Sequence, residues 1–592
     1  AQDILAKSIH QKQHTFFQCL CAGSFGAMGC FSSTEREHLT TPSVPVSARV
    51  WRLPALEGKT SKNEGFPEAG EIEDFITRTK DVGLALSGGG IRASSESLGI
   101  LQALHAHGFL DKVRYISSNS GSSWLNAAIS FLPDHVPLDI FLGGAPLGPA
   151  NLTLSALDEQ QEGSFLKAAS NAHPTKMIKE DLFGFRSQKH LKAWNNAVMY
   201  AYLKPFDLYH ENSVMSTPIG TEGHRRAQAA VEKTGTRITA MRKNAAFPII
   251  HAARANRGDD PGGMWYPLEF TPLYCGTPML DGEAEGGAIG GGMIESFGFN
   301  SPAPNLPDGR TAVNDGEEVM VKPNYWLPLA MAAGSSSGAP YVRLKAHTTV
   351  GQKLIGGSTC ELWSPADTTS SNNRMTNIAD GGAVDNSAVL ALLRRGVQHV
   401  VAQIAQQVAV TDPDFTNQVW WPSLFGRATV GLSNTSKDAN ALNTRSQVFD
   451  PEEYDKLMAE FKKKVEKGLP PVVEQTLEVR PNPRCGVNNN YKVHVLRVIA
   501  GVSPAFRSAL PAETKQQLEK EPPAWKSRKT GVLHLLQEQD DLDQHFPFNI
   551  TFYGDYSTRL VRMLAENTAY NLIEGGGTSL KKFFENDSAH RP

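Results

Sequence analysis

The segment VGLALSGGGIRASSESLGILQALHAHGFLDKVRYISSNSGSSWLNAAISFL, residues 82–132, alternates short apolar runs with turns made of small residues. The run at 82–87 leads into three glycines, which is typical of a buried strand followed by a tight turn. A helix is predicted over 92–107, because Gly108 stands where a helix commonly ends. Its apolar positions recur at every third residue, at Leu98, Leu101 and Leu104.

The pattern then repeats. Residues 113–117, VRYIS, form a second apolar run, and SSWLNAAISFL from Ser122 onward predicts a second helix. The order strand, glycine turn, helix, strand, serine turn, helix is that of a parallel α/β sheet. No repeat with a period of about 20 to 50 residues is visible, which disfavours a solenoid or a propeller.

The chain has 592 residues, of which 40% are hydrophobic, as expected for a globular protein with a sizeable core. Its 58 basic and 61 acidic residues give a net charge of −3, so no global field recruits nucleic acid or anionic lipid. The six cysteines include no C-x-x-C pair, which argues against a zinc site and a disulfide scaffold. A reducing, intracellular compartment, cytosolic or organellar, is favoured over secretion. No window approaches the ~20 apolar residues of a membrane-spanning helix.

Residues 1–78 are polar and weakly periodic, and we interpret them as an N-terminal arm that precedes the folded domain. The domain is predicted to run from 79 to 592, with an inserted cap at about 135–245. The small-residue stretch at 16–31 has two interpretations. It is either a connector packed on the domain or an interfacial or S-acylated membrane contact.

The serine turn at 116–124, ISSNSGSSW, has features of a nucleophile elbow, in which a serine lies on a sharp bend between a strand and a helix. The bend needs small residues two before and two after the nucleophile. With Ser120 as the nucleophile, these neighbours are Ser118 and Ser122, which are small but are not the glycines of G-x-S-x-G. On spacing alone, a plain polar turn stays open as the alternative.

The glycine turn SGGGIR at 87–92 supplies further groups that acyl transfer needs. Backbone N–H groups of glycines at a helix start can approach the oxygen that becomes negative, so Gly89 and Gly90 are candidates for an oxyanion hole. Arg92 lies in the first helical turn, where the helix dipole disfavours a cation. A nearby anionic ligand such as a phosphate would explain its position, and pairing with a surface carboxylate is the alternative.

A proton acceptor for the serine is not evident among the 17 histidines, none of which lies in a turn resembling that of a triad member. The sequence DGG at 380–382 offers Asp380 instead, held by a tight turn before a helix. A carboxylate can accept the serine proton if it hydrogen-bonds the hydroxyl and is partly desolvated. Taken alone, DGG is an ordinary turn.

Together, these motifs resemble the catalytic domain of the patatin-like, cytosolic (group IV) phospholipase A2 family, which is related to fungal lysophospholipases (phospholipases B). In that family, a serine in G-L-S-G-[SG]-[ST]-W pairs with an aspartate in D-[SG]-G, and S-G-G-G-x-R-A supplies the oxyanion hole and a phosphate-facing arginine. Here SGGGIRA matches in full, SNSGSSW matches from Ser120 to Trp124, and DGG matches. Further similar stretches begin at Phe247, Met264, Ala332 and Phe546.

The resemblance implies an α/β fold with a central, largely parallel sheet flanked by helices and with large insertions that form a cap. It implies that Ser120 attacks a fatty-acyl ester of a phospholipid or lysophospholipid at a membrane surface. Asp380 would take the serine proton and later activate water, while Gly89 and Gly90 would hold the oxyanion. Arg92 would face the phosphate, and no metal or other cofactor would take part. Peripheral membrane association through local basic stretches is expected.

Departures from the family pattern keep other hypotheses open. Ser118 stands where the family has glycine, and Asn119 stands where it usually has an apolar residue. The arm is also too short for the calcium-binding β-sandwich of some relatives, so calcium-driven recruitment is not expected. One alternative is a catalytically inactive, phospholipase-like structural or lipid-binding subunit of a larger assembly. Another is a general esterase or acyltransferase that uses the same serine and aspartate.

Overall fold

The computed structural model describes most of the chain, and the structural statements below concern its described residues. These are residues 45–52, 66–173, 193–232, 234–255, 265–279, 283–284, 287–338, 358–413, 415–418, 421–427, 446–488, 490–521, 539–549 and 555–585. The two interpretations of residues 16–31 fall outside these ranges.

Five strands form the parallel centre of the main sheet, in the order β6-β3-β2-β15-β17. Each of β2 and β3 is buried along its whole length, as expected for parallel strands that are covered on both faces. The predicted α/β fold, with a central, largely parallel sheet flanked by helices, is confirmed. The bounds of the five strands are β2 Val82–Leu86, β3 Tyr115–Ser118, β6 Phe247–Ala255, β15 His399–Ile404 and β17 Tyr491–Ile499.

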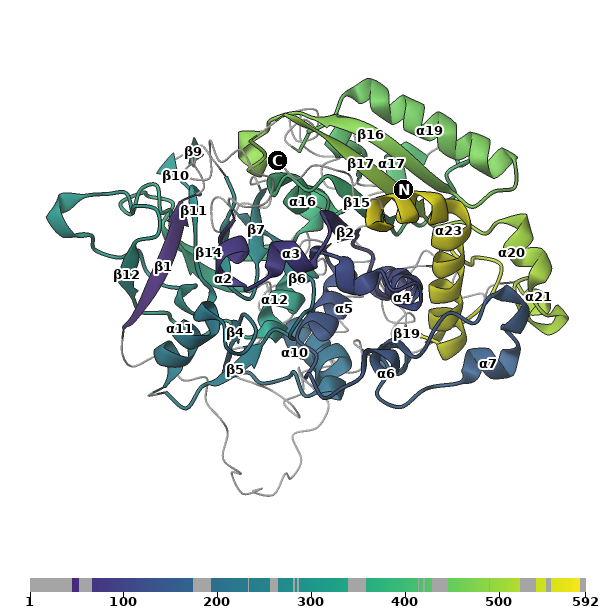
Figure 1. Ribbon diagram of the computed structural model, residues 1–592, viewed down its shortest axis with the longest axis horizontal. Helices are drawn as coiled ribbons and strands as arrows, with labels where there is room; N and C mark the ends of the chain where they lie inside the picture. Colours follow the sequence, from purple (N-terminus) through teal and green to yellow (C-terminus); the bar gives the residue numbers. More distant parts are fainter. Residues whose placement is uncertain are drawn as a thin grey trace, which may run out of the picture. The chain divides into compact units, whose positions relative to one another are not determined.

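Helices flank this centre, and the two predicted ones follow β2 and β3 directly. They are α4 (Gly90–Ala106) and α5 (Gly121–Ser130). The long C-terminal helix α23 (Thr558–Glu585) lies beside α4 (Figure 1). The two backbones approach closely, because a Cβ added at Gly99 would lie 2.0 Å from the carbonyl oxygen of Ala565. Helix α16 (Leu390–Arg394) packs against β2.

Antiparallel strands extend the sheet beyond β6, in the order β7-β8-β11-β1-β12, and we call them the flank. The far edge is also antiparallel, because β16 pairs with β17 in that sense. Strand β14 pairs with both β6 and β13. The bounds are β1 Val46–Arg52, β7 Trp265–Phe270, β8 Tyr274–Thr277, β11 Gly292–Glu295, β12 Glu318–Val321, β13 Thr359–Leu362, β14 Arg374–Asp380 and β16 Val472–Val479.

The N-terminal boundary of this fold differs from the predicted one near residue 78. Strand β1 lies inside the segment interpreted as an arm, yet it pairs with β11 and β12. Helices α2 (Pro67–Glu71) and α3 (Phe75–Arg78) follow it, and Phe75 packs edge-to-face on Tyr115 of β3 at 5.4 Å between ring centroids. The pairing partners of β1 lie more than 200 residues away in sequence, so local periodicity does not reveal this strand.

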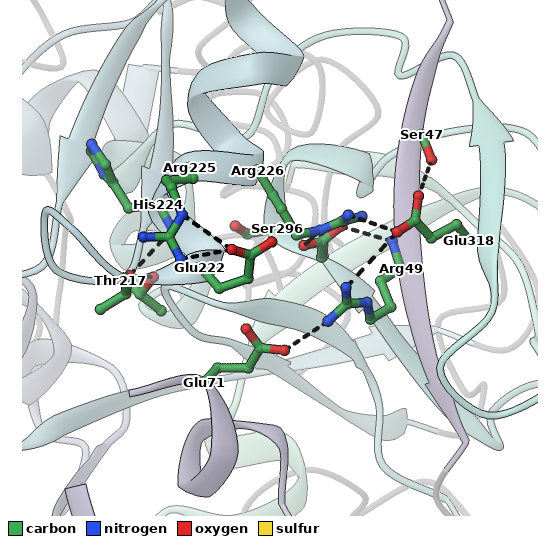
Figure 2. A network of polar contacts seen from close by, with 12 residues as sticks. Ser47, Arg49, Glu71, Thr217, Glu222, His224, Arg225, Arg226, Ser296 and Glu318 are labelled. Carbon is green, nitrogen blue, oxygen red and sulfur yellow. Dashed lines mark hydrogen bonds and ion pairs between the residues drawn. The ribbon is translucent and has the colours of Figure 1, made fainter. Parts of the chain in front are cut away.

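Residues from the predicted cap at about 135–245 include helices and a separate two-stranded parallel sheet of β4 (Ser213–Ser216) and β5 (Arg237–Ala240). Helix α11 (Glu222–Val231) connects these two strands. Arg226 of α11 donates two hydrogen bonds of 2.6 and 2.8 Å to Glu295 of β11. It also donates to Glu318 of β12 at 2.7 Å, and Figure 2 shows this contact. Of the helices that the structure describes, none is both long and apolar enough to span a membrane.

Candidate active site

Ser120 lies on a sharp bend between β3 and α5. Its backbone has φ 51° and ψ −128°, a conformation that residues with a side chain rarely adopt. The surrounding structure holds this bend, because the Ser120 N–H donates to Ser336 Oγ at 3.0 Å and its carbonyl accepts from the Ser123 N–H at 2.9 Å. Backbone strain of this kind is a feature of nucleophile elbows.

Asp380 is the last residue of β14, and strand pairing brings it to the bend. It lies opposite Ala252 of β6, and β6 is the parallel neighbour of β3. The Ser120 Oγ donates a hydrogen bond to Asp380 Oδ2 at 2.9 Å, and the Gly382 N–H donates to Oδ1 at 2.8 Å. Ser120 and Asp380 retain only 9% and 7% of their exposure. The structure therefore places the predicted hydroxyl and carboxylate in direct contact and largely out of water.

The glycine turn lies against the same bend. Gly89 and Gly90 have φ of 150° and 60°, which favour glycine, and they begin α4. A Cβ added at Gly88 would lie 2.9 Å from Ser120 Cβ, and one at Gly121 would lie 2.1 Å from the Gly90 carbonyl oxygen. Within the described residues, no group accepts a hydrogen bond from the amides of Gly89 and Gly90. The turn that packs against Ser120 thus carries two backbone donors without an acceptor among the described residues.

An amide pair joins the three turns of the site. Asn119 Nδ2 donates to Asn386 Oδ1 at 3.0 Å, and the Gly88 N–H donates to the Asn386 carbonyl at 2.9 Å. A Cβ added at Gly381 would lie 2.4 Å from Asn119 Oδ1. The apolar-to-polar change at Asn119 therefore has a structural explanation. Asn386 is not predicted from the sequence, where its one signal is its position shortly after DGG.

The serine-rich stretch at 332–340 contributes a second missed group. Ser336, the last residue of α12 (Leu329–Ser336), accepts the Ser120 N–H and also contacts Ser123 Oγ at 2.8 Å. The next residue, Ser337, accepts a hydrogen bond from Trp124 Nε1 at 2.9 Å. Resemblance singled out this stretch, but only the fold shows that it supports the bend.

Ser118 does not disturb the elbow. It ends β3 in an extended strand, so its Cβ needs no special backbone conformation. The hydroxyl accepts from Asn126 Nδ2 at 2.8 Å and donates to Ser123 Oγ at 3.2 Å. Because this buried hydroxyl has hydrogen-bond partners, its burial does not leave an unpaired polar group beside the turn.

Arg92 reaches the glycine turn but has partners inside the protein. A Cβ added at Gly89 would lie 3.3 Å from Arg92 Nη2. Nη1 donates to the Asn549 carbonyl at 2.7 Å, and Nε lies 3.7 Å from Glu96 Oε1. The carboxylate that pairs with Arg92 is therefore buried. The sequence predicted either a ligand phosphate or a surface carboxylate, and neither prediction included a buried partner.

The histidine of β6, His251, contacts Ser117 and not the predicted nucleophile Ser120. His251 Nε2 contacts Ser117 Oγ at 2.9 Å, and that hydroxyl donates to the Ala388 carbonyl at 2.6 Å. Burial lowers the pKa of His251 to about 4, so the ring is neutral at pH near 7. No group of three or more His, Cys, Asp or Glu side chains in the described ranges is arranged to hold a metal ion.

No family model matches the chain, and no curated protein matches it. Among solved structures, the chain is similar to human GIVD cytosolic phospholipase A2, with 12% sequence identity, a TM-score of 0.44, and coverage of 86% of this chain and 62% of that chain. It is also similar to the same human protein in complex with methyl gamma-linolenyl fluorophosphonate, with 13% identity, a TM-score of 0.37, and coverage of 86% and 59%. The chain spans about three fifths of the length of these structures. The likeness is one of fold.

Proposed function

We propose that this protein is a serine hydrolase that cleaves fatty-acyl esters of glycerophospholipids or lysophospholipids through a Ser–Asp pair. The observation that carries the proposal is the 2.9 Å hydrogen bond from Ser120 Oγ to Asp380 Oδ2 at a strained bend between a strand and a helix. A hydroxyl in this position has a partly desolvated base in contact with it, which is what nucleophilic attack on an ester requires.

The proposed reaction assigns a role to each of these groups. As Ser120 Oγ attacks the ester carbonyl carbon, its proton moves to Asp380 and the carbonyl oxygen becomes negative. The N–H groups of Gly89 and Gly90 stabilise that oxygen. The tetrahedral intermediate expels the alcohol, which takes the proton from Asp380, and leaves an acyl-enzyme. Asp380 then takes a proton from water, and the resulting hydroxide attacks the acyl carbon. The second tetrahedral intermediate expels Ser120, which takes the proton back from Asp380, and the fatty acid is released.

The lipid class of the substrate rests on the resemblance of the motifs, which also assigns Arg92 to the phosphate. On the same basis we propose that the protein works at a membrane surface as a peripheral, intracellular enzyme. The rival hypothesis of an inactive subunit draws on the altered elbow and on the long insertions. Ser118 gives it little support, because its side chain is accommodated and hydrogen-bonded within the strand.

An activity-based fluorophosphonate probe tests the proposal, because it bonds only to activated serines. We expect covalent labelling of the wild type, none of Ser120→Ala, and labelling of Asp380→Asn slowed by about 10³-fold or more. Ser130→Ala is the matched control, since Ser130 lies at the other end of α5 and donates to Asn126 Oδ1. It should label like the wild type. A folded wild type that does not label, or labelling that survives in Ser120→Ala, refutes the proposal.

A lysophospholipid assay then tests the substrate class. We expect release of free fatty acid by the wild type and by Ser130→Ala, and none by Ser120→Ala. Labelling without release from phospholipid or lysophospholipid would retain a serine hydrolase but reject the lipid class. Transfer of the acyl group to another alcohol in place of release would identify an acyltransferase.

A further inference from the structure

Helix α4 begins with a buried pair of opposite charges. Arg92 and Glu96 are one helical turn apart, with 3.7 Å between Arg92 Nε and Glu96 Oε1, and each side chain is only 3% exposed. A cation in the first turn is disfavoured by the helix dipole, and a buried charge needs a partner. Glu96 therefore supplies from within the protein the negative charge that a ligand phosphate would otherwise provide.

One amino group of the Arg92 guanidinium, Nη2, points toward the glycine turn and is not used in the contacts described above. Nη1 is engaged by the Asn549 carbonyl and Nε lies beside Glu96. Nη2 lies next to Gly89, and no described residue accepts a hydrogen bond from it. A phosphate oxygen at the glycine turn can accept a hydrogen bond from Nη2. The negative charge of Glu96, beside the same guanidinium, would then weaken the attraction between Arg92 and the phosphate.

Glu96 is held in place independently of Arg92. Its Oε2 accepts a hydrogen bond of 2.7 Å from Gln403 Nε2 of β15. Among the described residues, Tyr556 of β19 (Asp555–Tyr556) interacts electrostatically with both Arg92 and Glu96, and Asp540 of β18 (Gln539–Asp540) interacts with Tyr556. Glu96→Gln keeps an acceptor oxygen for Gln403 and removes the negative charge, which makes the substitution a probe of that charge.

We propose that Glu96 is a specificity-determining residue that sets how strongly Arg92 attracts the phosphate of the head group. When Glu96 is ionised, the pair is close to neutral and phosphate binding is weak. When Glu96 is protonated, the full charge of Arg92 acts on the phosphate. Contacts with the acyl chain and the ester carry no such charge and are indifferent to Glu96.

The environment of Glu96 makes both states available near neutral pH. Burial raises the pKa of Glu96 to about 7, against the lowering effects of Arg92 and of the hydrogen bond from Gln403. Protonation below this pH removes the negative charge beside Arg92. Phosphate recognition should therefore strengthen as pH falls and weaken as pH rises.

The inference rests on the proposed function only through the site that it assigns to Arg92, so binding tests it without catalysis. The probes are an ether-linked 1-alkylglycerophosphocholine, which an esterase cannot cleave, and the matching 1-alkylglycerol, which has no phosphate. Both are used below their micellar concentrations. Dissociation constants are measured by calorimetry at about pH 6 and about pH 8, on either side of the Glu96 titration.

We expect the wild type to bind the phosphocholine ligand about tenfold more tightly at the lower pH, as the neutralisation of one nearby charge can produce. Glu96→Gln should bind it tightly at both pH values, and 1-alkylglycerol should bind alike in every case. Glu295→Gln is the matched control, because Glu295 is a buried carboxylate paired with a different arginine, Arg226. It should keep the pH dependence of the wild type.

The inference is overturned if Glu96→Gln keeps the pH dependence, if the two ligands change in parallel, or if neither ligand binds. Its failure and that of the proposed function are distinguishable. Fluorophosphonate labelling of Ser120 without any effect of Glu96 on phosphate binding rejects the inference alone. A Glu96-dependent phosphate preference in a protein that does not label rejects the hydrolase alone. The folded state of Glu96→Gln is checked by thermal unfolding monitored by circular dichroism.

Discussion

Buried polar side chains lie on both sides of β6, and the two groups differ in charge. Toward the flank, paired charges and a tyrosine form what we call the flank network, consisting of Glu68, Glu269, Tyr274, Arg394 and Arg395. Arg395 lies 3.0 Å from both Glu68 Oε1 and Glu269 Oε2, and these three side chains are fully buried. Around the nucleophile, neutral groups form what we call the site junction, consisting of Gly88, Asn119, Ser336, Gly382 and Asn386.

The difference in charge matches the different tasks of the two regions. Burial alone would raise the pKa of Glu269, but Arg395 and Arg394 lower it to about 2, so it stays ionised and paired. A cation held that close to Asp380 would weaken it as a proton acceptor in the same way. Amide and hydroxyl donors can fix positions with a smaller effect. Paired charges thus stabilise the flank, while neutral groups position the reacting atoms without lowering the basicity of Asp380.

The flank also uses paired charges near its edge, where β1 and β12 meet α11. Arg226 contacts Glu295. Figure 2 shows its contact with Glu318 and the 2.7 Å contact of Arg49 with Glu71. These pairs join α11 and α2 to the strands of the flank, far along the sheet from the bend at Ser120. Charge pairing therefore recurs through the flank. Removing one charge from the flank network tests whether paired charges stabilise the fold without acting on the reacting atoms.

The largest effect is expected for Arg395→Met, which removes the centre of the flank network. Two buried carboxylates, Glu68 and Glu269, would lose a partner, and breaking buried pairs of this kind costs about 3 to 5 kcal/mol. The free energy of unfolding, measured with denaturant, should fall by this amount. At a temperature where the variant is folded, its rate of fluorophosphonate labelling should match that of the wild type.

Arg480→Met is the control for that experiment. Arg480 pairs with Asp450 on the surface, where both side chains are substantially exposed, so the loss should be about 0 to 1 kcal/mol. The comparison of the two regions fails if Arg395→Met is as mild as Arg480→Met. It also fails if folded Arg395→Met labels slowly, because the flank would then control the reacting atoms.

The sequence predicted the parallel centre better than the flank, for a physical reason. Strands β2 and β3 and the helices after them leave local signals, namely short apolar runs, leucines at every third position, and Gly108 with φ 66° where α4 ends. The flank depends on pairing between distant segments. Val50 of β1, for example, lies opposite Ile294, and no local pattern specifies that partner.

The same limit applied to the site. The turns that carry Ser120, Gly89 and Gly90 predict their roles. The DGG turn makes Asp380 a candidate proton acceptor, but taken alone it is an ordinary turn, and the resemblance of motifs is what pairs it with Ser120. Its position depends on β14 pairing with β6, which is again a long-range choice. Asn386 and Ser336 were missed because their roles consist of contacts with residues more than 200 positions away.

A second, smaller effect concerns His251, which lies between the two regions. It stands opposite Glu269 in the pairing of β6 with β7 and contacts Ser117 of β3. Burial and, next, Arg394 lower its pKa to about 4, from an unfolded value near 6.5. The unfolded chain therefore binds the proton first as pH falls, and the contribution of His251 to stability is lost between about pH 6.5 and pH 4.

His251→Gln should remove this loss, which amounts to about 2 kcal/mol between pH 7 and pH 5. The amide can still donate to Ser117. The raised pKa of Glu96 gives a slope of opposite sign, since the folded state then keeps a proton that the unfolded state releases, so the wild-type curve alone does not isolate His251. The quantity to measure is the difference between variant and wild-type unfolding free energies across this pH range. A difference that does not vary with pH would contradict the assignment.

The smallest effect on stability, but a selective effect on activity, is expected for Asn119→Leu at the site junction. Leucine fills a similar volume, while the bond to Asn386 Oδ1 is lost, at a cost of about 1 kcal/mol. Because that bond ties the bend at Ser120 to the turns of Gly88 and Asp380, kcat should fall by about tenfold, or about 1.4 kcal/mol in barrier. Asn571→Leu is the control, because it removes a 2.8 Å bond to the Gly501 carbonyl from a buried asparagine of α23. If both variants lose similar stability and only Asn119→Leu loses kcat, neutral contacts at the junction position the reacting atoms. Equal kcat in both would show that Ser120 and Asp380 meet without the amide pair.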